Sequence, residues 1–180
     1  MRAARPLSLR FVPTALALAL GTAATVPVRA GSPAVEPKAA FERLKSLAGT
    51  WEGQAGHGQP GQPATVTYRV ASGGSVVEET LFPETPHEMV SMYHLADGAL
   101  VMTHYCAMAN QPRMRLDAKA STADRLVFAF DGGTNFDPAR DTHVHSGVLE
   151  WKGDAVHADW AVWTGGKEAA HNVFELRRKK

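Results

Sequence analysis

The 180-residue sequence has only one cysteine, Cys106, and few aromatic residues. A single cysteine excludes an intramolecular disulfide, so this thiol is a buried wall residue, a metal ligand or a reactive group. Phe, Trp and Tyr make up 8% of the chain and charged residues 21%, without a long block of one sign. This composition is typical of one folded domain and does not suit a coiled coil, a collagen or a disordered tail.

A basic surface is also missing. Four of the nineteen basic residues lie in the first thirty positions, so residues 31–180 carry 15 basic against 18 acidic residues, a net charge of −3. Nucleic-acid binding needs Lys and Arg gathered on one face. We therefore expect no nucleic-acid partner.

The apolar run at the N-terminus has the pattern of an export signal. Arg2, Arg5 and Arg10 flank the start of the apolar residues 11–25, and Val28 and Ala30 are small residues three and one places before a cut ahead of position 31. An uncleaved anchor is the alternative, but the run is shorter than the roughly 20 residues of a bilayer span. We predict a cleaved signal peptide over 1–30, a flexible segment over 31–38 and a single domain over 39–180. The domain should be periplasmic or secreted, without a stable membrane span.

The mature chain begins with a helical pattern and then becomes an all-β sequence. Phe41, Leu44 and Leu47 fall at helical spacing, which predicts one short amphipathic helix. From Gly49 onward, short runs rich in Val, Thr and aromatic residues alternate with turns at intervals of about ten residues. The predicted strands are 49–54, 64–71, 75–82, 88–95, 100–107, 113–119, 125–130, 142–151, 155–163 and 168–177.

Ten strands joined mostly by tight hairpins favour an up-and-down antiparallel arrangement. Closing it into a barrel removes the exposed edges, and a barrel of this size holds one small ligand. An open sandwich is the alternative. Alternation in two strands indicates which residues point inward; these are Met114, Leu116, Ala118, Leu126, Phe128 and Phe130.

Two pairs of residues have the spacing of metal or ligand contacts. His143 and His145 share one face of a strand, about 6.6 Å apart along the backbone, and His104 and Cys106 share a face of another. If both faces point inward, the four side chains form a set suited to zinc or copper. Leu149 lies on the same face as His143 and His145, which favours the inward orientation over a solvent-facing one.

Hairpin pairing and alternation define two further inward candidates. A two-residue turn at Asp97-Gly98 places His94 and His104 on opposite faces, and we expect His104 inward unless a bulge intervenes. Glu78 and Glu79 are adjacent on one strand, so one of them points inward. A buried carboxylate needs a partner, and a histidine or an arginine would serve.

Two loops carry polar groups beyond what a plain turn requires. Asn110 and Gln111 are suited to closing over a ligand at the barrel mouth, although the same residues are ordinary loop formers. The irregular segment 131–141 has the length of a functional lid, or of a simple mobile loop.

The segment Phe41 to Gly53, with Gly49-Thr-Trp51, resembles the opening of lipocalin-like (calycin) proteins, in which a short helix precedes a G-x-W motif on the first strand. This resemblance implies that a basic residue near the last strand, Arg177 or Arg178, packs across Trp51. A guanidinium over an indole is a favourable cation–π contact.

Further segments, including Thr103-His-Tyr-Cys106 through Arg113 and Thr142-His-Val-His145, resemble a group of uncharacterised bacterial secreted lipocalin-like proteins over essentially the whole mature chain. The resemblance implies a fold and no reaction. More distantly, the ten strands are similar to nitrobindin-like and fatty-acid-binding-type barrels. Nitrobindin-like barrels hold haem through a histidine, but no histidine here matches that ligand.

These observations support two functions. The first is a secreted or periplasmic barrel that binds a small amphipathic or apolar ligand in a pocket lined by apolar residues and histidines. The second is an enzyme that uses a metal, a haem or Cys106 as nucleophile. The catalytic residues and the cofactor stay unknown, with zinc, copper and haem as candidates. The predicted ligand contacts are His104, Cys106, Asn110, Gln111, Met114, Phe128, His143 and His145, of which His104, Cys106, His143 and His145 would hold a metal.

Overall fold

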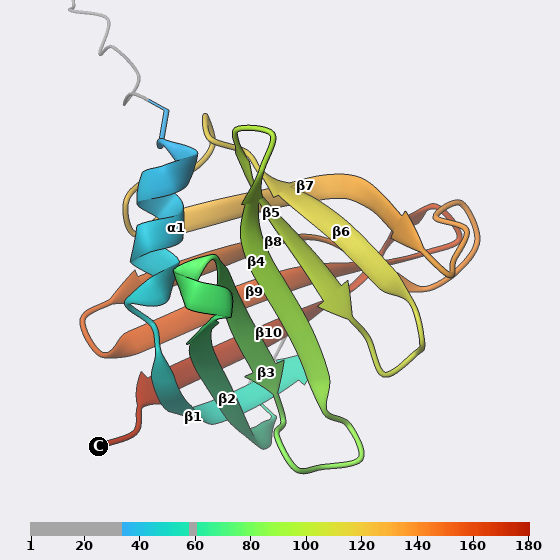
Figure 1. The fold of residues 1–180 in the computed structure, drawn as a ribbon. Helices are drawn as coiled ribbons and strands as arrows, with labels where there is room; N and C mark the ends of the chain where they lie inside the picture. Colours follow the sequence, from blue (N-terminus) through green and yellow to red (C-terminus); the bar gives the residue numbers. More distant parts are fainter. Residues whose placement is uncertain (1–33, 58–60) are drawn as a thin grey trace, which may run out of the picture. The chain divides into compact units, whose positions relative to one another are not determined.

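The computed structural model describes residues 34–57 and 61–180, which form one short helix and ten strands (Figure 1). The predicted signal peptide over 1–30 lies outside the described residues. The elements are α1 (Pro37–Lys45), β1 (Gly49–His57), β2 (Gln62–Ala71), the 3-10 turn η1 (Ser72–Gly74), β3 (Val76–Leu81), β4 (Met89–Ala96), β5 (Ala99–Tyr105), β6 (Gln111–Leu116), β7 (Arg125–Thr134), β8 (His143–Lys152), β9 (Ala155–Thr164) and β10 (Lys167–Arg178).

The strands form a closed antiparallel barrel in which each strand pairs with its neighbours along the chain. β1 pairs with β10, from Trp51 opposite Arg178 to His57 opposite Asn172, and this pairing closes the sheet. All ten predicted strands and the up-and-down order are confirmed, and the open sandwich is excluded. Within the described residues every strand therefore has a paired neighbour on both sides, although β7 and β8 pair only from Arg125–Glu150 to Phe128–Gly147. No helix of the described residues is long and apolar enough to cross a membrane.

The helix packs against the same core as the inward residues of the barrel. It begins at Pro37, where a proline is tolerated because the first N–H groups of a helix have no partner. Its Phe41 and Leu44 are 3% and 0% exposed, as their helical spacing predicts. The Val35 N–H donates to the Ala118 carbonyl, so residues 35–38, expected to be flexible, belong to the folded domain.

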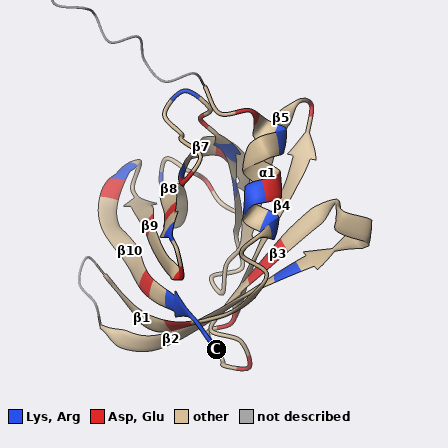
Figure 2. Cartoon of the chain, turned by 90° about the vertical axis from the view of Figure 1, so that its left-hand side faces the viewer, with Lys and Arg blue, Asp and Glu red and all other residues tan. Residues whose placement is uncertain are grey.

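The strand faces also follow the predicted alternation. Met114, Leu116, Leu126 and Phe128 are all buried in the core, while Phe130 is half-buried where β7 separates from β8. Acidic and basic residues are interspersed along the strands and on α1 (Figure 2). They form exposed ion pairs such as Arg69–Glu78 between β2 and β3 and Arg125–Glu150 between β7 and β8.

Arg178 supplies the predicted basic residue over the tryptophan. Its guanidinium carbon lies 4.3 Å from the centre of a Trp51 ring, and its two terminal nitrogens donate to the carbonyls of Ala48 and Ser46. The neighbouring Arg177 is exposed. One arginine therefore ties the last strand to the first strand and to the end of α1.

Gly147 allows a tryptophan to lie flat against β8, which leads to a first prediction. A Cβ at this position would lie 1.9 Å from Cε3 of Trp160, far inside van der Waals contact. We expect Gly147→Ala to lower the free energy of unfolding by about 1–3 kcal/mol, the usual cost of overpacking. Urea denaturation measures the loss. In a Trp160→Leu background the same substitution should cost less, and an equal cost in both backgrounds would contradict the contact.

Candidate ligand-binding site

A row of polar side chains crosses the inside of the barrel. In strand register Tyr68 on β2 lies opposite Glu79 on β3, Glu79 opposite Ser91 on β4, and Ser91 opposite His104 on β5. Register partners share one face of a sheet, so the four side chains point the same way. All four are buried, with exposures between 1% and 5%. The sequence therefore places a continuous polar row in an otherwise apolar interior.

The carboxylate of Glu79 is the centre of this row. The hydroxyl of Tyr68 donates to Oε1 at 2.6 Å and that of Tyr93 donates to Oε2 at 2.9 Å. Burial raises the pKa of Glu79, and hydrogen bonds from Tyr68, Tyr93 and Ser91 oppose that rise. Burial and the nearby carboxylate raise the pKa of both tyrosines well above 10. The inward glutamate predicted from sequence is thus Glu79, but its partners are tyrosines rather than a histidine or an arginine.

His104 points inward, as predicted. Its Nδ1 lies 3.0 Å from the Ser91 hydroxyl. Within residues 34–57 and 61–180, this is the one hydrogen bond that the His104 ring forms. Burial lowers the pKa of His104 to about 4, so the imidazole is neutral at pH 7. A neutral ring whose Nδ1 is held by Ser91 has Nε2 left for a ligand.

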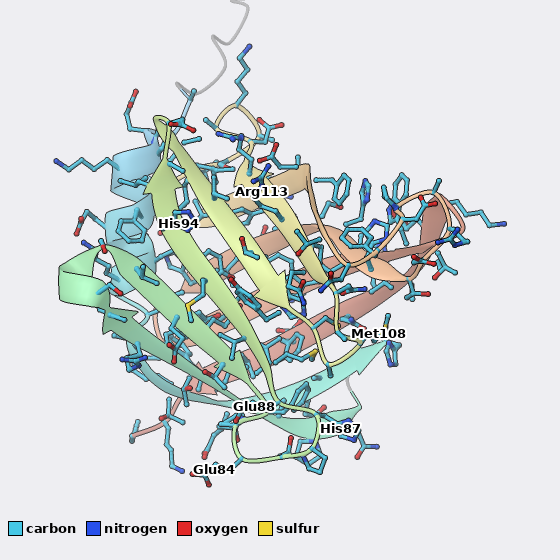
Figure 3. All side chains as sticks on the ribbon, turned by 45° about the vertical axis from the view of Figure 1, so that its right-hand side comes forward. Glu84, His87, Glu88, His94, Met108 and Arg113 are labelled. Atoms are coloured by element: carbon cyan, nitrogen blue, oxygen red, sulfur yellow. The ribbon has the colours of Figure 1, made fainter. Side chains whose placement is uncertain are left out.

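His104 lines a small inner cavity that shares part of its wall with a larger cavity at the barrel mouth. The inner cavity has a volume of about 60 Å³ and the mouth cavity about 810 Å³. Met89, Asn172 and Phe174 line both. The mouth is formed by the end of β1, the start of β2, the middle of β10 and the β3–β4 loop, which carries Glu84, His87 and Glu88 in Figure 3.

Cys106 lies at the same inner cavity, just beyond the end of β5. Its Sγ is 4.0 Å from the Sδ of Met89 on β4. The side chain is half-buried rather than sealed in the core. The structure thus brings together two of the predicted contacts, His104 and Cys106, in one cavity.

His143 and His145 do not line this cavity, which corrects the expectation that they point inward. The pairing of β8 with β9 shifts between Val144 and Ser146, so β8 carries a bulge at His145. Without a bulge, Leu149 and His143 would point to the same face of β8. The extra residue at the bulge puts His143 on the opposite face from Leu149. Val144 lines the inner cavity instead, and His143 lies opposite Trp163 on the other face.

The two histidines belong to an aromatic cluster beneath the β7–β8 loop, residues 135–142. The ring of His145 stacks between Trp163, at a centroid distance of 3.7 Å, and Phe130, at 4.4 Å. His143 Nε2 lies 3.0 Å from His145 Nδ1, and Phe136 of the loop covers the His143 ring at 4.7 Å. The loop predicted as a lid therefore covers histidines and not the inner cavity.

The four predicted metal ligands are consequently divided between two places. His104 and Cys106 lie at the inner cavity, and His143 and His145 lie in the aromatic cluster. In the part of the chain that the structure describes, no three His, Cys, Asp or Glu side chains are grouped so as to hold a metal ion. The predicted four-residue set is not assembled.

The predicted loop contacts Asn110 and Gln111 hold other loops. The Asn110 amide donates to the Thr142 carbonyl at 2.8 Å. The Gln111 side-chain oxygen accepts hydrogen bonds from Thr134 and Asn135. These hydrogen bonds fasten Asn110 and Gln111 to residues 134–142, while Asn110 Oδ1 is buried without a hydrogen-bond partner among the described residues.

Met114 and Phe128, also predicted as ligand contacts, are 0% exposed and packed in the core. Neither is among the residues that line the inner or the mouth cavity. Sequence reasoning missed Met89, Asn172 and Phe174, which line both. Strand alternation alone could have placed Asn172 and Phe174 on one face of β10, but nothing in the sequence marks that face as a cavity wall.

No protein-family model matches the chain, and no curated protein matches it. The closed ten-stranded antiparallel barrel is compatible with a calycin-like barrel. Membership of the lipocalin or nitrobindin families stays a prediction.

Proposed function

We propose that the protein binds a small amphipathic molecule, which enters through the mouth and directs its polar end to the inner cavity. The observation that carries the proposal is that two neighbouring cavities share the wall residues Met89, Asn172 and Phe174. One cavity is wide and largely apolar, and the other is small and lined by His104. A mouth of about 810 Å³ lies within the range of small-ligand sites, roughly 300–1,000 Å³.

The walls favour an apolar ligand body. Phe82 and Phe174 pack at the mouth with ring centroids 5.7 Å apart, and Met89 continues the apolar wall inward. Trp160 and Val144 line the inner cavity. Burial of apolar ligand surface against such a wall supplies most of the binding free energy.

The polar end of the ligand would be recognised by two groups. Asn172 lines both cavities, and His104 contributes a neutral imidazole. A neutral hydroxyl, amine or amide suits this pair better than a charged group, which would lose its hydration without gaining an opposite charge.

We propose binding rather than nucleophilic catalysis, and we propose that it takes place after export through the predicted signal. A catalytic thiol needs a base at hydrogen-bond distance. The contact of Cys106 within the described residues is to the thioether of Met89, which is not a base.

The neutral fluorophore N-phenyl-1-naphthylamine tests the proposal, because it combines an apolar body with one N–H donor. Ligands of this size gain a binding free energy of about 0.3 kcal/mol per non-hydrogen atom, so we expect 1:1 binding with a Kd of about 0.2 mM or lower. Phe82→Asn should weaken binding about fivefold or more through lost apolar contact. Asn suits this position because Phe82 has a φ of 52°, a left-handed conformation that Asn adopts readily.

Leu95→Ser is the matched control. Leu95 is a similarly apolar side chain, 40% exposed, at the other end of β4 from the mouth. Its replacement should leave the fluorophore affinity unchanged. The proposal is overturned if the folded protein does not bind the fluorophore, or if Phe82→Asn and Leu95→Ser have the same effect.

A further inference from the structure

The inner cavity is unusually rich in sulfur. Three of its ten lining residues, Met89, Met102 and Cys106, carry a sulfur atom, and His104 adds an imidazole. These donors come from β4, from β5 and from the residue that follows β5. Methionine thioethers are also metal ligands, so these sulfurs add to the His, Cys, Asp and Glu side chains considered above.

The separation of two of these sulfurs fits coordination of a single ion. Cys106 Sγ and Met89 Sδ are 4.0 Å apart. Two sulfurs each about 2.3 Å from one ion, at an angle of about 120°, are separated by about 4.0 Å. The cavity volume of about 60 Å³ is enough for one ion and too small for a large cofactor.

The third donor is held in position by the polar row. His104 is 5% exposed, and its Nδ1 is engaged by Ser91, which lies next to Glu79. Its Nε2 has no hydrogen-bond partner in the described residues. Histidines that bind metals characteristically use their other ring nitrogen in this way, which fixes the orientation of the ring. Ser91 and Glu79 would therefore act as positioning residues.

From this geometry we propose that Met89, His104 and Cys106 form a three-coordinate site for copper(I). Soft thiolate and thioether ligands select Cu(I), whereas Zn²⁺ uses thiolate, imidazole and carboxylate donors in a tetrahedral site. Cys106 binds as the thiolate, and its proton passes to solvent. No electron transfer is involved in binding. Copper(I) would take the same His104 Nε2 that the proposed function assigns to the polar end of the ligand. The fluorophore is therefore titrated against the copper-free protein, and Phe82→Asn, which changes no copper ligand, tests the mouth alone.

Anaerobic competition between the intact protein and the Cu(I) chelator bicinchoninate tests the site. We expect one Cu(I) per chain. Met89→Leu is close in volume, so the barrel should fold, and its affinity should fall about tenfold or more, equivalent to at least about 1.4 kcal/mol. Cys106→Ser and His104→Gln should weaken binding at least as much.

Met108→Leu is the matched control. This methionine is 55% exposed in the β5–β6 turn, outside the cavity, and is labelled in Figure 3. X-ray absorption of the copper-loaded protein should show two sulfurs at about 2.3 Å and one nitrogen at about 2.0 Å. Absence of 1:1 binding, an equal loss in Met108→Leu and Met89→Leu, or Zn²⁺ binding with the same affinity and ligands would each overturn the proposal.

Discussion

Replacement of Trp51 by alanine should lower the free energy of unfolding by about 3–5 kcal/mol. The side chain is 0% exposed, so its removal leaves a large cavity where α1 meets the barrel. Its Nε1 also donates to the Leu47 carbonyl at 2.8 Å, and this acceptor would lose its partner. Urea denaturation at pH 7 measures the effect, and near-native stability of the variant would contradict a central role for Trp51.

Substitution of two adjacent arginines tests how much the contacts of Arg178, which include the cation–π contact with Trp51, contribute to the free energy of unfolding. Arg178 covers the Trp51 ring and donates to two backbone carbonyls, so Arg178→Ala should cost about 1–2 kcal/mol. Arg177 is exposed, and Arg177→Ala should change stability by no more than about 0.5 kcal/mol. Equal effects of the two substitutions would show that the contact with Trp51 is energetically unimportant.

Much of this fold could be predicted from local patterns because a meander of hairpins has mostly local pairing. The turn at Asp97-Gly98 fixes the register of β4 on β5, and this register correctly paired Ser91 with His104. The alternation in β6 correctly buried Met114 and Leu116. Closure of the barrel was expected because it removes exposed edges. The packing of Arg177 or Arg178 across Trp51 followed from the resemblance, because no local pattern links the first and last strands.

The candidate site was harder to predict because single-residue irregularities decide which side chains meet. The bulge at His145 moved His143 and His145 to the opposite face from the cavity, although Leu149 is inward as expected. Alternation cannot reveal such a bulge in advance. In the polar row, alternation does predict the side-chain directions. The pairing of β3 with β4 has no bulge, so Glu79 and Ser91 lie on the inward face that strict alternation assigns to them.

The buried imidazole of His104 should make the metal-free protein sensitive to mild acid. Its pKa is lowered from 6.5 to about 4, so between these values the unfolded chain binds a proton that the folded chain does not. The free energy of unfolding therefore falls as the pH drops through this window. The His104 contribution to the loss is about 2 kcal/mol between pH 7 and pH 5, and about 3 kcal/mol once the pH is below both pKa values. Glu79 acts in the opposite direction, because its raised pKa makes the folded state the better proton acceptor.

Comparison with His104→Gln isolates the imidazole from these other groups. Glu79, Tyr68 and Tyr93 are unchanged in this variant, as is His145, whose pKa is lowered by burial and by His143. Urea denaturation of both proteins at pH 7, 6 and 5 should show that the stability difference shifts by about 2 kcal/mol in favour of the variant at the lowest pH. Parallel pH profiles for the two proteins would mean that His104 is protonated as easily in the folded chain as in the unfolded one. Such a ring would be hydrated rather than sealed, and the inner cavity would be open to bulk water.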